Sequence, residues 1–281
     1  MTTAHPVDRA PLRVAAAQVT AVPGDLAGNA RMAAECIAEA AARGVHLVVF
    51  PELSLCGYDV GLLRDDIARC AVEPDGEPLE VVAEACRTHR VVAVVGGCLR
   101  RAGGWVIGAL VLGADGGLAA GYDKRHLDRD EREFFVPGHA DTLVEVRGWR
   151  LGLGICYDSS FPEHARALAL AGADAYLCPS AFQTGDSDHR RGVYFPARAL
   201  ENTCYVVFAN FAGSHGSWEF AGRSAVYAPD GRVLADAGRG PGLAVADLDD
   251  AVLRRHRDAL RMLADRAAPA PPPAAVPVRA G

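Results

Sequence analysis

Short apolar runs alternate along this chain with longer stretches in which apolar residues recur at helical spacing. Arg13 to Val19 is an apolar run that predicts a first strand, and the segment GlyAspLeuAlaGlyAsn after it introduces a helix that ends near Gly44. Residues 44–50 form a second continuous apolar run, and residues 76–90 again have helical spacing. This alternation of strand, helix and strand is typical of a layered α/β fold.

The middle of the chain predicts strands that turn back on themselves. Residues 91–98 are largely apolar, and the next apolar run is flanked by glycine pairs at 103–104 and 116–117. Glycine pairs are typical of hairpin turns, so part of the sheet should be antiparallel and the sheet as a whole mixed. Later patterns predict strands at 149–155, 173–180 and 204–210, a helix from about Gly192 to Asn202, and a hairpin around ProAspGly.

The two ends of the chain differ from the rest in composition. Residues 1–11 lack the apolar core of a secretory signal, and residues 267–281 are rich in proline and alanine. Ala251 to Arg266 predicts a charged amphipathic helix before that tail. We therefore expect a flexible N-terminus over 1–11, one domain over 12–266 and a disordered tail over 267–281.

Composition and charge narrow the class of protein. Apolar residues make up 50% of the 281, which is ample for a large core, and the formal net charge is −6 with scattered basic residues. This balance does not support nucleic-acid binding, and no apolar run approaches the roughly 20 residues that span a bilayer. The 8 cysteines occur without CxxC pairs or matching histidine spacing, so neither a zinc site nor a disulfide framework is indicated. We expect a soluble cytoplasmic protein.

Three of the predicted strands end at a chemically reactive residue. Cys156 follows an apolar strand and precedes a helix with Pro162 in its first turn, where backbone N–H groups favour a thiolate. Glu52 follows the run at 44–50, and Lys124 follows a later run. Each has an ordinary alternative, such as a buried core cysteine or a surface lysine. Because open α/β sheets gather ligand chemistry at the carboxyl ends of their strands, the three together indicate one site.

The segments around these residues resemble the signatures of the nitrilase, or carbon–nitrogen hydrolase, superfamily. The matching segments are ProGluLeuSerLeuCysGlyTyr around Glu52, TyrAspLysArgHisLeu around Lys124 and GlyIleCysTyrAspSerSerPheProGlu around Cys156. GluArgGluPhePheValProGly resembles the family's second-glutamate segment, and its ProGly spacing points to Glu131 rather than Glu133. The resemblance is specific because separate segments occur in the family's order.

The resemblance implies a four-layer αββα sandwich with mixed sheets and an enzyme that cleaves non-peptide C–N bonds. Cys156 would be the nucleophile, Glu52 the general base and Lys124 the residue that holds the oxyanion. Glu131 would orient the lysine or the substrate. The expected substrate is a small linear amide or an N-carbamoyl compound, which reacts through a cysteine thioester without a metal or organic cofactor. A homodimer or larger homo-oligomer is the expected assembly.

Residues beside the three strand ends are the candidates for binding substrate. The backbone N–H of Tyr157 is expected to help bind the oxyanion, and Ala181 and Phe182 are expected to line the pocket after another strand. The polar stretch 183–192 is either a solvated loop or a roof over the pocket. Asp158 is expected to cap the helix that follows the nucleophile.

Two features of the sequence bear on the choice of substrate. Nitrile-cleaving relatives tend to carry Trp-Glu after the cysteine, and CysTyrAsp here looks more like the amidase branches. Relatives that hydrolyse N-carbamoyl D-amino acids carry arginines where this chain has Ser159 and Ser160, so Arg190 or Arg191 would have to bind a carboxylate. A nitrilase, a non-catalytic protein of the same fold and an acyltransferase remain the alternative functions.

Overall fold

The structure is a computed structural model that describes residues 9–267, and most of its strands belong to two sheets. The first sheet contains β1 (Leu12–Gln18), β2 (Leu47–Val49), β3 (Val92–Arg101), β4 (Gly104–Leu112), β5 (Leu118–Asp123) and β14 (Gly242–Leu248). The second contains β6 (Leu143–Val146), β7 (Trp149–Leu153), β8 (Ala175–Pro179), β9 (Tyr205–Ala209), β12 (Ala225–Tyr227) and β13 (Val233–Asp236). A small hairpin pairs β10 (Ser214–His215) with β11 (Trp218–Glu219).

Helices form the outer layers and the connections. The α-helices are α1 (Leu26–Ala42), α2 (Val60–Asp66), α3 (Glu77–His89), α4 (Pro162–Leu170), α5 (Asp186–Asn202) and α6 (Asp250–Ala259). Short 3-10 turns are η1 (Ile67–Cys70), η2 (Glu131–Glu133) and η3 (Cys156–Ser160).

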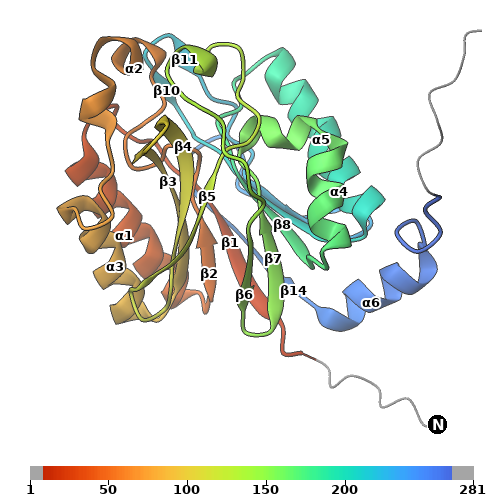
Figure 1. Cartoon of the computed structure of the whole chain (residues 1–281). Coiled ribbons are helices and arrows are strands. Elements are labelled where there is room, and N and C mark those ends of the chain that lie inside the picture. The colour runs from red at the N-terminus through yellow and green to blue at the C-terminus, as the bar shows by residue number, and fades with distance from the viewer. Residues whose placement is uncertain (1–8, 268–281) are drawn as a thin grey trace, which may run out of the picture.

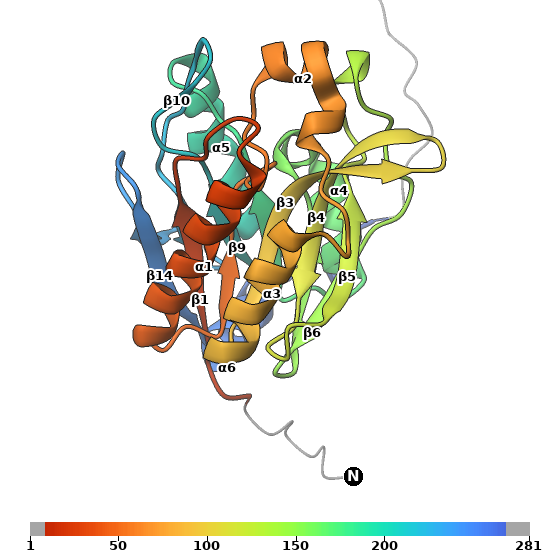
Figure 2. The ribbon, with the colours of Figure 1, turned by 90° about the vertical axis from the view of Figure 1, so that its left-hand side faces the viewer.

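The two sheets lie face to face between two pairs of helices. Helices α1 and α3 cover the outer face of the first sheet, and α4 and α5 cover the outer face of the second (Figure 1). Figure 2 shows α1 and α3 side by side in front of the first sheet. The four layers therefore follow the order helix, sheet, sheet, helix, which confirms the fold expected from the resemblance.

Both sheets are mixed, as the glycine pairs suggested. In the first sheet β1, β2 and β3 are parallel, whereas β14, β4 and β5 join through antiparallel pairs. In the second, β7, β8 and β9 are parallel and β6 and β12 pair antiparallel with them. The central strands β2, β8 and β9 are buried along their whole length, because one face meets the other sheet and the opposite face meets helices.

Two helices differ from their predicted limits. Helix α5 begins at Asp186 rather than near Gly192, so most of the polar stretch 183–192 is helical. Asp186 and Asp188 occupy its first turn, where acidic side chains interact favourably with the helix dipole. Helix α6 ends at Ala259 instead of continuing to residue 266, and the residues beyond it are mostly exposed and bury little of their apolar surface.

The predicted domain limits are only partly within the described residues. The first strand begins at Leu12, next to the expected boundary. Most of the expected N-terminal segment, residues 1–8, and nearly all of the expected tail, residues 268–281, lie outside the described part of the chain. The domain limits stay a prediction.

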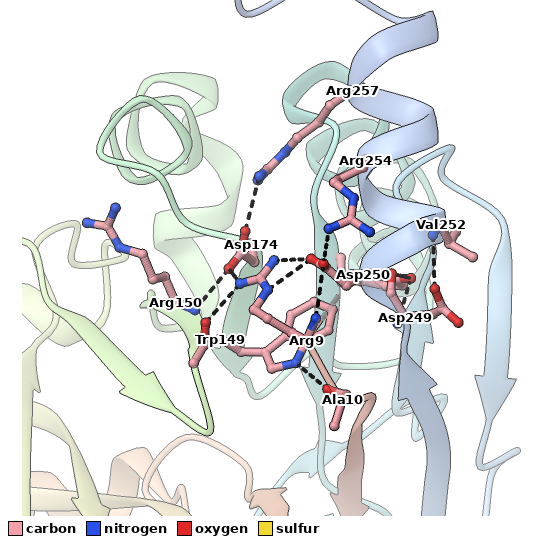
Figure 3. Close-up of polar contacts among 12 residues, drawn as sticks. Arg9, Ala10, Trp149, Arg150, Asp174, Asp249, Asp250, Val252, Arg254 and Arg257 are labelled. Atoms are coloured by element: carbon pink, nitrogen blue, oxygen red, sulfur yellow. Dashed lines mark hydrogen bonds and ion pairs between the residues drawn. The ribbon is translucent and has the colours of Figure 1, made fainter. Parts of the chain in front are cut away.

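A cluster of arginines and aspartates fastens α6 and the segment before β1 to the second sheet (Figure 3). The guanidinium of Arg9 contacts the carboxylates of Asp174 and Asp250, each at 2.5 Å. Arg257 contacts Asp174 at 3.1 Å, and Arg254 contacts Asp250 at 2.5 Å. Both aspartates are only 4% exposed, and each has two arginine partners, so the attraction offsets the cost of burying the charge.

Candidate active site

Glu52 lies just beyond β2, in a turn for which Gly96 of β3 makes room. A Cβ atom on Gly96 would collide with the backbone of Pro51 and Leu53. Leu53, the next residue, has a left-handed backbone with a φ of 52°. The N–H of Glu52 donates at 3.3 Å to the carbonyl of Ser180, which follows β8 of the second sheet. This turn holds the Glu52 side chain between the two sheets.

Cys156 follows β7 and is the first residue of η3. Its φ is 43°, a left-handed conformation that costs energy for a non-glycine residue and is concentrated at functional sites. The chain reaches this turn through Gly154, where a Cβ atom would collide with the hydroxyl of Tyr176. Helix α4 then begins at Pro162, as the sequence predicted.

Lys124 lies at the end of β5 and is buried between two glutamates. Its Nζ donates to Oε1 of Glu52 at 2.7 Å and to the two oxygens of Glu131 at 2.6 and 2.8 Å. Glu52 and Lys124 are 0% exposed and Glu131 is 3% exposed. Glu133, in contrast, is exposed and pairs with Arg64, so Glu131 is the glutamate that reaches the lysine.

The two glutamates differ in their free hydrogen-bonding capacity. Besides Lys124, Oε1 of Glu131 accepts from the hydroxyl of Tyr58 at 2.8 Å, and Oε2 accepts from the N–H of Asp128 at 2.7 Å. Oε2 of Glu52 is buried and has no hydrogen-bond partner among the described residues. Of the two carboxylates, Glu52 is therefore the one with an oxygen available to take a proton.

Burial and charge set the protonation of the three central groups. Burial raises the pKa of Glu52 to about 8, an effect that Lys124 opposes and Glu131 reinforces. Burial opposes the charge on Lys124, but the carboxylates of Glu131 and Glu52 outweigh it and hold its pKa well above the usual value. Burial and the negative charge of Glu52 raise the pKa of the Cys156 thiol despite the attraction of Lys124. The resting site therefore favours a neutral thiol beside a charged lysine.

A cavity of about 550 Å³ opens onto these groups. Its lining includes Glu52, Lys124, Glu131 and Cys156, together with the three predicted binding residues Tyr157, Ala181 and Phe182. The site residues named from sequence thus all meet at one cavity.

Part of the cavity wall was not anticipated from sequence. Tyr58 and Trp218 line it with their rings stacked, the centroids 4.9 Å apart. Tyr58 belongs to the glutamate signature itself, so its place near Glu52 was a usable signal. Trp218 comes from the β10–β11 hairpin, and nothing in the sequence linked that hairpin to the site.

The first turns of α5 also reach the cavity. Ser187 and Arg190 line it, whereas Arg191 contacts Asp188 at 2.8 Å and the hydroxyl of Tyr227 at 3.2 Å. Of these two arginines, Arg190 is therefore the one that lines the cavity, and the stretch 183–192 contributes to the pocket wall.

Asp158 does not cap α4 as expected, although it lies in the first turn of η3 and its carboxylate accepts from the backbone of that turn's N-cap residue. The N-cap of α4 is Phe161, which has no side-chain cap bond. The carboxylate of Asp158 instead accepts from groups that precede it in the chain, including the N–H of Ile155 at 2.9 Å. A local capping rule could not reveal its other partners, because Tyr122 lies in β5 and His126 in the segment after it, far from Asp158 in sequence.

Within residues 9–267, no group of three or more His, Cys, Asp or Glu side chains is arranged to hold a metal ion. No helix in this part of the chain has the length and apolar character needed to cross a bilayer.

Comparison with known proteins places the chain in a family. The profile of the carbon–nitrogen hydrolase family matches residues 13–258. The "Hydrolase in pqqF 5'region" of Pseudomonas protegens is 36% identical over 91% of this chain and 89% of its own length. An (R)-stereoselective amidase from a Pseudomonas species is also 36% identical, over 91% of each chain.

Solved structures agree with the sequence comparison. The amidase NitN from Nesterenkonia sp. AN1 superposes with a TM-score of 0.79 at 31% identity, covering 91% of this chain and 96% of that one. A variant of the same amidase carries the acetamide moiety of fluoroacetamide on its active-site cysteine, with a TM-score of 0.79, 30% identity and coverage of 91% and 93%. This chain therefore belongs to the carbon–nitrogen hydrolase family and is an enzyme of its amidase-like branch.

Proposed function

We propose that this enzyme hydrolyses the C–N bond of a small linear amide or N-carbamoyl compound through a thioester on Cys156. Glu52 is the general base, and Lys124 with the backbone N–H of Tyr157 binds the oxyanion. Glu131 holds Lys124 in place. The products are a carboxylic acid, or a carbamic acid from a ureido substrate, and ammonia or an amine.

The observation that carries the proposal is the unequal bonding of the two glutamates around one lysine. Both oxygens of Glu131 accept hydrogen bonds from Lys124, and they also accept from Tyr58 and from the backbone N–H of Asp128. Glu131 can therefore hold the lysine in place but has no free oxygen for a proton. Glu52 shares Lys124 through one oxygen and keeps the other unpartnered in the cavity that contains Cys156. The presence of a carboxylate, a cation and a thiol at one cavity supports acyl transfer to Cys156.

The acylation half of the reaction begins with a neutral thiol. As Sγ attacks the carbonyl carbon, its proton passes to Glu52, and the carbonyl oxygen becomes an oxyanion next to Lys124. When the tetrahedral intermediate collapses, Glu52 returns the proton to the leaving nitrogen and the C–N bond breaks. Because the thiol pKa is raised, proton transfer and attack should occur together rather than through a stable thiolate.

Deacylation repeats these steps with water. Glu52 takes a proton from water as its oxygen adds to the thioester carbon, and the new oxyanion is again bound by Lys124. Collapse breaks the C–S bond and releases the acid, and the proton on Glu52 returns to the sulfur. Every group is then back in its starting protonation state.

An amide suits this arrangement better than a nitrile. Attack on an amide produces an oxyanion at once, which Lys124 can stabilise directly. Attack on a nitrile produces a thioimidate nitrogen that must be protonated before water adds. A matched amide and nitrile with the same acyl chain should differ in kcat/KM in favour of the amide, and a nitrile preference above about tenfold, roughly 1.4 kcal/mol, would reverse the assignment.

The test of the nucleophile combines turnover with mass spectrometry. The purified protein is screened against amides, ureido compounds and nitriles for release of ammonia. Cys156→Ala should fold normally but lose turnover, and the acyl adduct found on the wild type in intact-mass spectra should be missing. Cys86→Ala is the matched control, because it removes a buried thiol of α3 that does not line the cavity. Turnover by folded Cys156→Ala would refute the proposed nucleophile.

We also propose that the protein forms a homodimer or larger homo-oligomer through the outer layer made by α4 and α5. These helices expose Leu170, Val193 and Leu200 with 44%, 52% and 41% of their surface accessible. Light scattering should give a mass above the 29.5 kDa of one chain, and a monomer mass across a wide concentration range would contradict the proposal.

The proposed compartment is the cytoplasm. All eight cysteines of the chain are free thiols, which is the state that a reducing compartment maintains. Cell fractionation of the source organism should recover the amidase activity in the cytoplasmic fraction, and recovery outside the cell would contradict this.

A further inference from the structure

The carboxylate of Asp158 is fully buried two residues after the nucleophile and accepts four hydrogen bonds. Oδ2 accepts from the N–H of Ile155 at 2.9 Å and from the hydroxyl of Tyr122 at 2.7 Å. Oδ1 accepts from the backbone N–H of His126 at 2.9 Å and lies 2.7 Å from its ring Nδ1. Because an ionised carboxylate can only accept hydrogen bonds, the ring nitrogen that faces Oδ1 is the protonated one.

These donors come from the two segments that carry the reacting groups. Ile155 is the residue before Cys156, at the start of the turn with left-handed backbone. Tyr122 and His126 flank Lys124, one two residues before it and the other two residues after. A single carboxylate therefore joins the nucleophile turn of the second sheet to the lysine segment of the first sheet.

The surroundings of Asp158 keep it charged and in place. Burial opposes the charge, but the hydrogen bonds from His126 and Tyr122 outweigh it and hold the pKa of its carboxyl below the usual value. The Tyr122 hydroxyl also lies 2.9 Å from Nε2 of His164, a buried residue of α4. The ring of His126 stacks on Phe161 at 4.0 Å between centroids. The carboxylate is thus part of a packed polar network and not a surface charge.

We propose that Asp158 is a positioning residue that fixes the sulfur of Cys156 relative to the ammonium of Lys124. The proposal rests on the proposed thioester mechanism, but it assigns Asp158 no contact with substrate. Asp158 acts on the reaction by hydrogen bonding to two segments. One is the Cys156 turn, whose strained backbone persists only when surrounding contacts stabilise it, and the other is the segment around Lys124.

Asp158→Asn tests this with a side chain of the same shape. A carboxylate can accept four hydrogen bonds, whereas an amide oxygen accepts two and the amide NH₂ would face donors. We expect kcat to fall by about 10- to 100-fold with KM changed less than about threefold, since small displacements of reacting groups cost rates of this order. The rate at which iodoacetamide alkylates Cys156, measured by peptide mass spectrometry, should fall in parallel. Asp158→Glu, which keeps the four-acceptor carboxylate, should retain more activity than Asp158→Asn.

Asp174→Asn is the matched control. It makes the same chemical change at another buried aspartate, in the arginine cluster away from the cavity. It should lower the melting temperature while leaving kcat and the alkylation rate of Cys156 within about twofold of wild type. If Asp158→Asn behaved in this same way, Asp158 would be a structural residue and the proposal would be overturned.

Tyr122→Phe keeps the proposal testable if Asp158→Asn does not fold. It removes one of the four donors and adds no atom, although it also takes a hydrogen-bond partner from Nε2 of His164, so it should fold and slow both kcat and alkylation by about three- to tenfold. Unchanged values for this variant would overturn the proposal. Alkylation needs no amide turnover, so the absence of amidase activity in the wild type would refute the proposed function without deciding the role of Asp158.

Discussion

The reactivity of Cys156 should increase with pH in step with the ionisation of Glu52. Burial raises the pKa of this carboxyl to about 8 from its usual 4.5, so near neutral pH it is mostly protonated and cannot take the thiol proton. With a pKa of about 8, roughly one tenth of the molecules carry an ionised Glu52 at pH 7 and nearly all do above pH 9. We therefore expect kcat/KM to rise about tenfold from pH 7 to a plateau above pH 9. Below pH 7 it should fall about tenfold per pH unit.

Substitutions of the two neighbours should move this midpoint in opposite directions. The negative charge of Glu131 favours protonated Glu52, so Glu131→Gln should lower the midpoint. The positive charge of Lys124 favours ionised Glu52, so Lys124→Met should raise it. Both variants are expected to turn over substrate slowly. The pH dependence is therefore measured as the rate of Cys156 alkylation by iodoacetamide, which does not need an oxyanion site.

The outcome can contradict the electrostatic reasoning in two ways. A midpoint near pH 5 in the wild type would show that Glu52 is ionised throughout the neutral range and that its burial is offset. Shifts of the same sign in the two variants would show that the midpoint belongs to another group. Glu133→Gln is the control, because this neighbouring glutamate is exposed and pairs with Arg64, and it should leave the midpoint unchanged.

Two further predictions concern the walls of the cavity. Tyr58→Phe removes the hydroxyl that donates to Glu131 at 2.8 Å. Because a hydrogen bond to a charged group is worth about 1.5–3 kcal/mol, kcat/KM should fall by about 10- to 100-fold. A loss under twofold would show that Lys124 and Asp128 hold Glu131 without this hydroxyl. Arg190 lines the cavity and has no ion-pair partner within residues 9–267, so Arg190→Gln should reduce the preference for an amide with a terminal carboxylate over its uncharged analogue by about tenfold. Arg129→Gln changes another lining arginine, which is already paired with Asp130, and should leave that preference within about twofold. Equal effects of the two variants would show that the preference comes from the net positive charge of the cavity lining and not from a contact with Arg190.

The sequence was sufficient to place the residues whose position follows from a strand end. Glu52, Lys124 and Cys156 each come directly after an apolar run, and strands that point the same way in a layered sheet bring such residues to one edge. Glu131 was reached through the ProGly spacing of its segment, and the exposed position of Glu133 agrees with that choice. The fold class followed in the same way from alternating strands and helices and from the resemblance.

Residues whose position depends on contacts far along the chain could not be placed from sequence. Trp218 reaches the cavity because a two-stranded hairpin folds back onto Tyr58. Asp158 has a side chain that suits a helix cap, but its donors in the folded chain belong to β5, to the segment just after β5 and to the residue before the nucleophile. Local rules ranked the capping role first because they compare only neighbours in sequence.

The division of the site between the two sheets determines what the rest of the fold must do. Glu52, Lys124 and Glu131 come from the first sheet and the segment after it, whereas Cys156 comes from the second. Neither sheet contains both a nucleophile and its base, so the reaction depends on how the inner faces pack. Two hydrogen-bonded links cross that division beside the site, from Glu52 to the carbonyl of Ser180 and from the Lys124 segment to Asp158. Because a displacement of about 1 Å can cost 10²-fold in rate, these links should affect turnover more strongly than their modest contribution to folding would suggest.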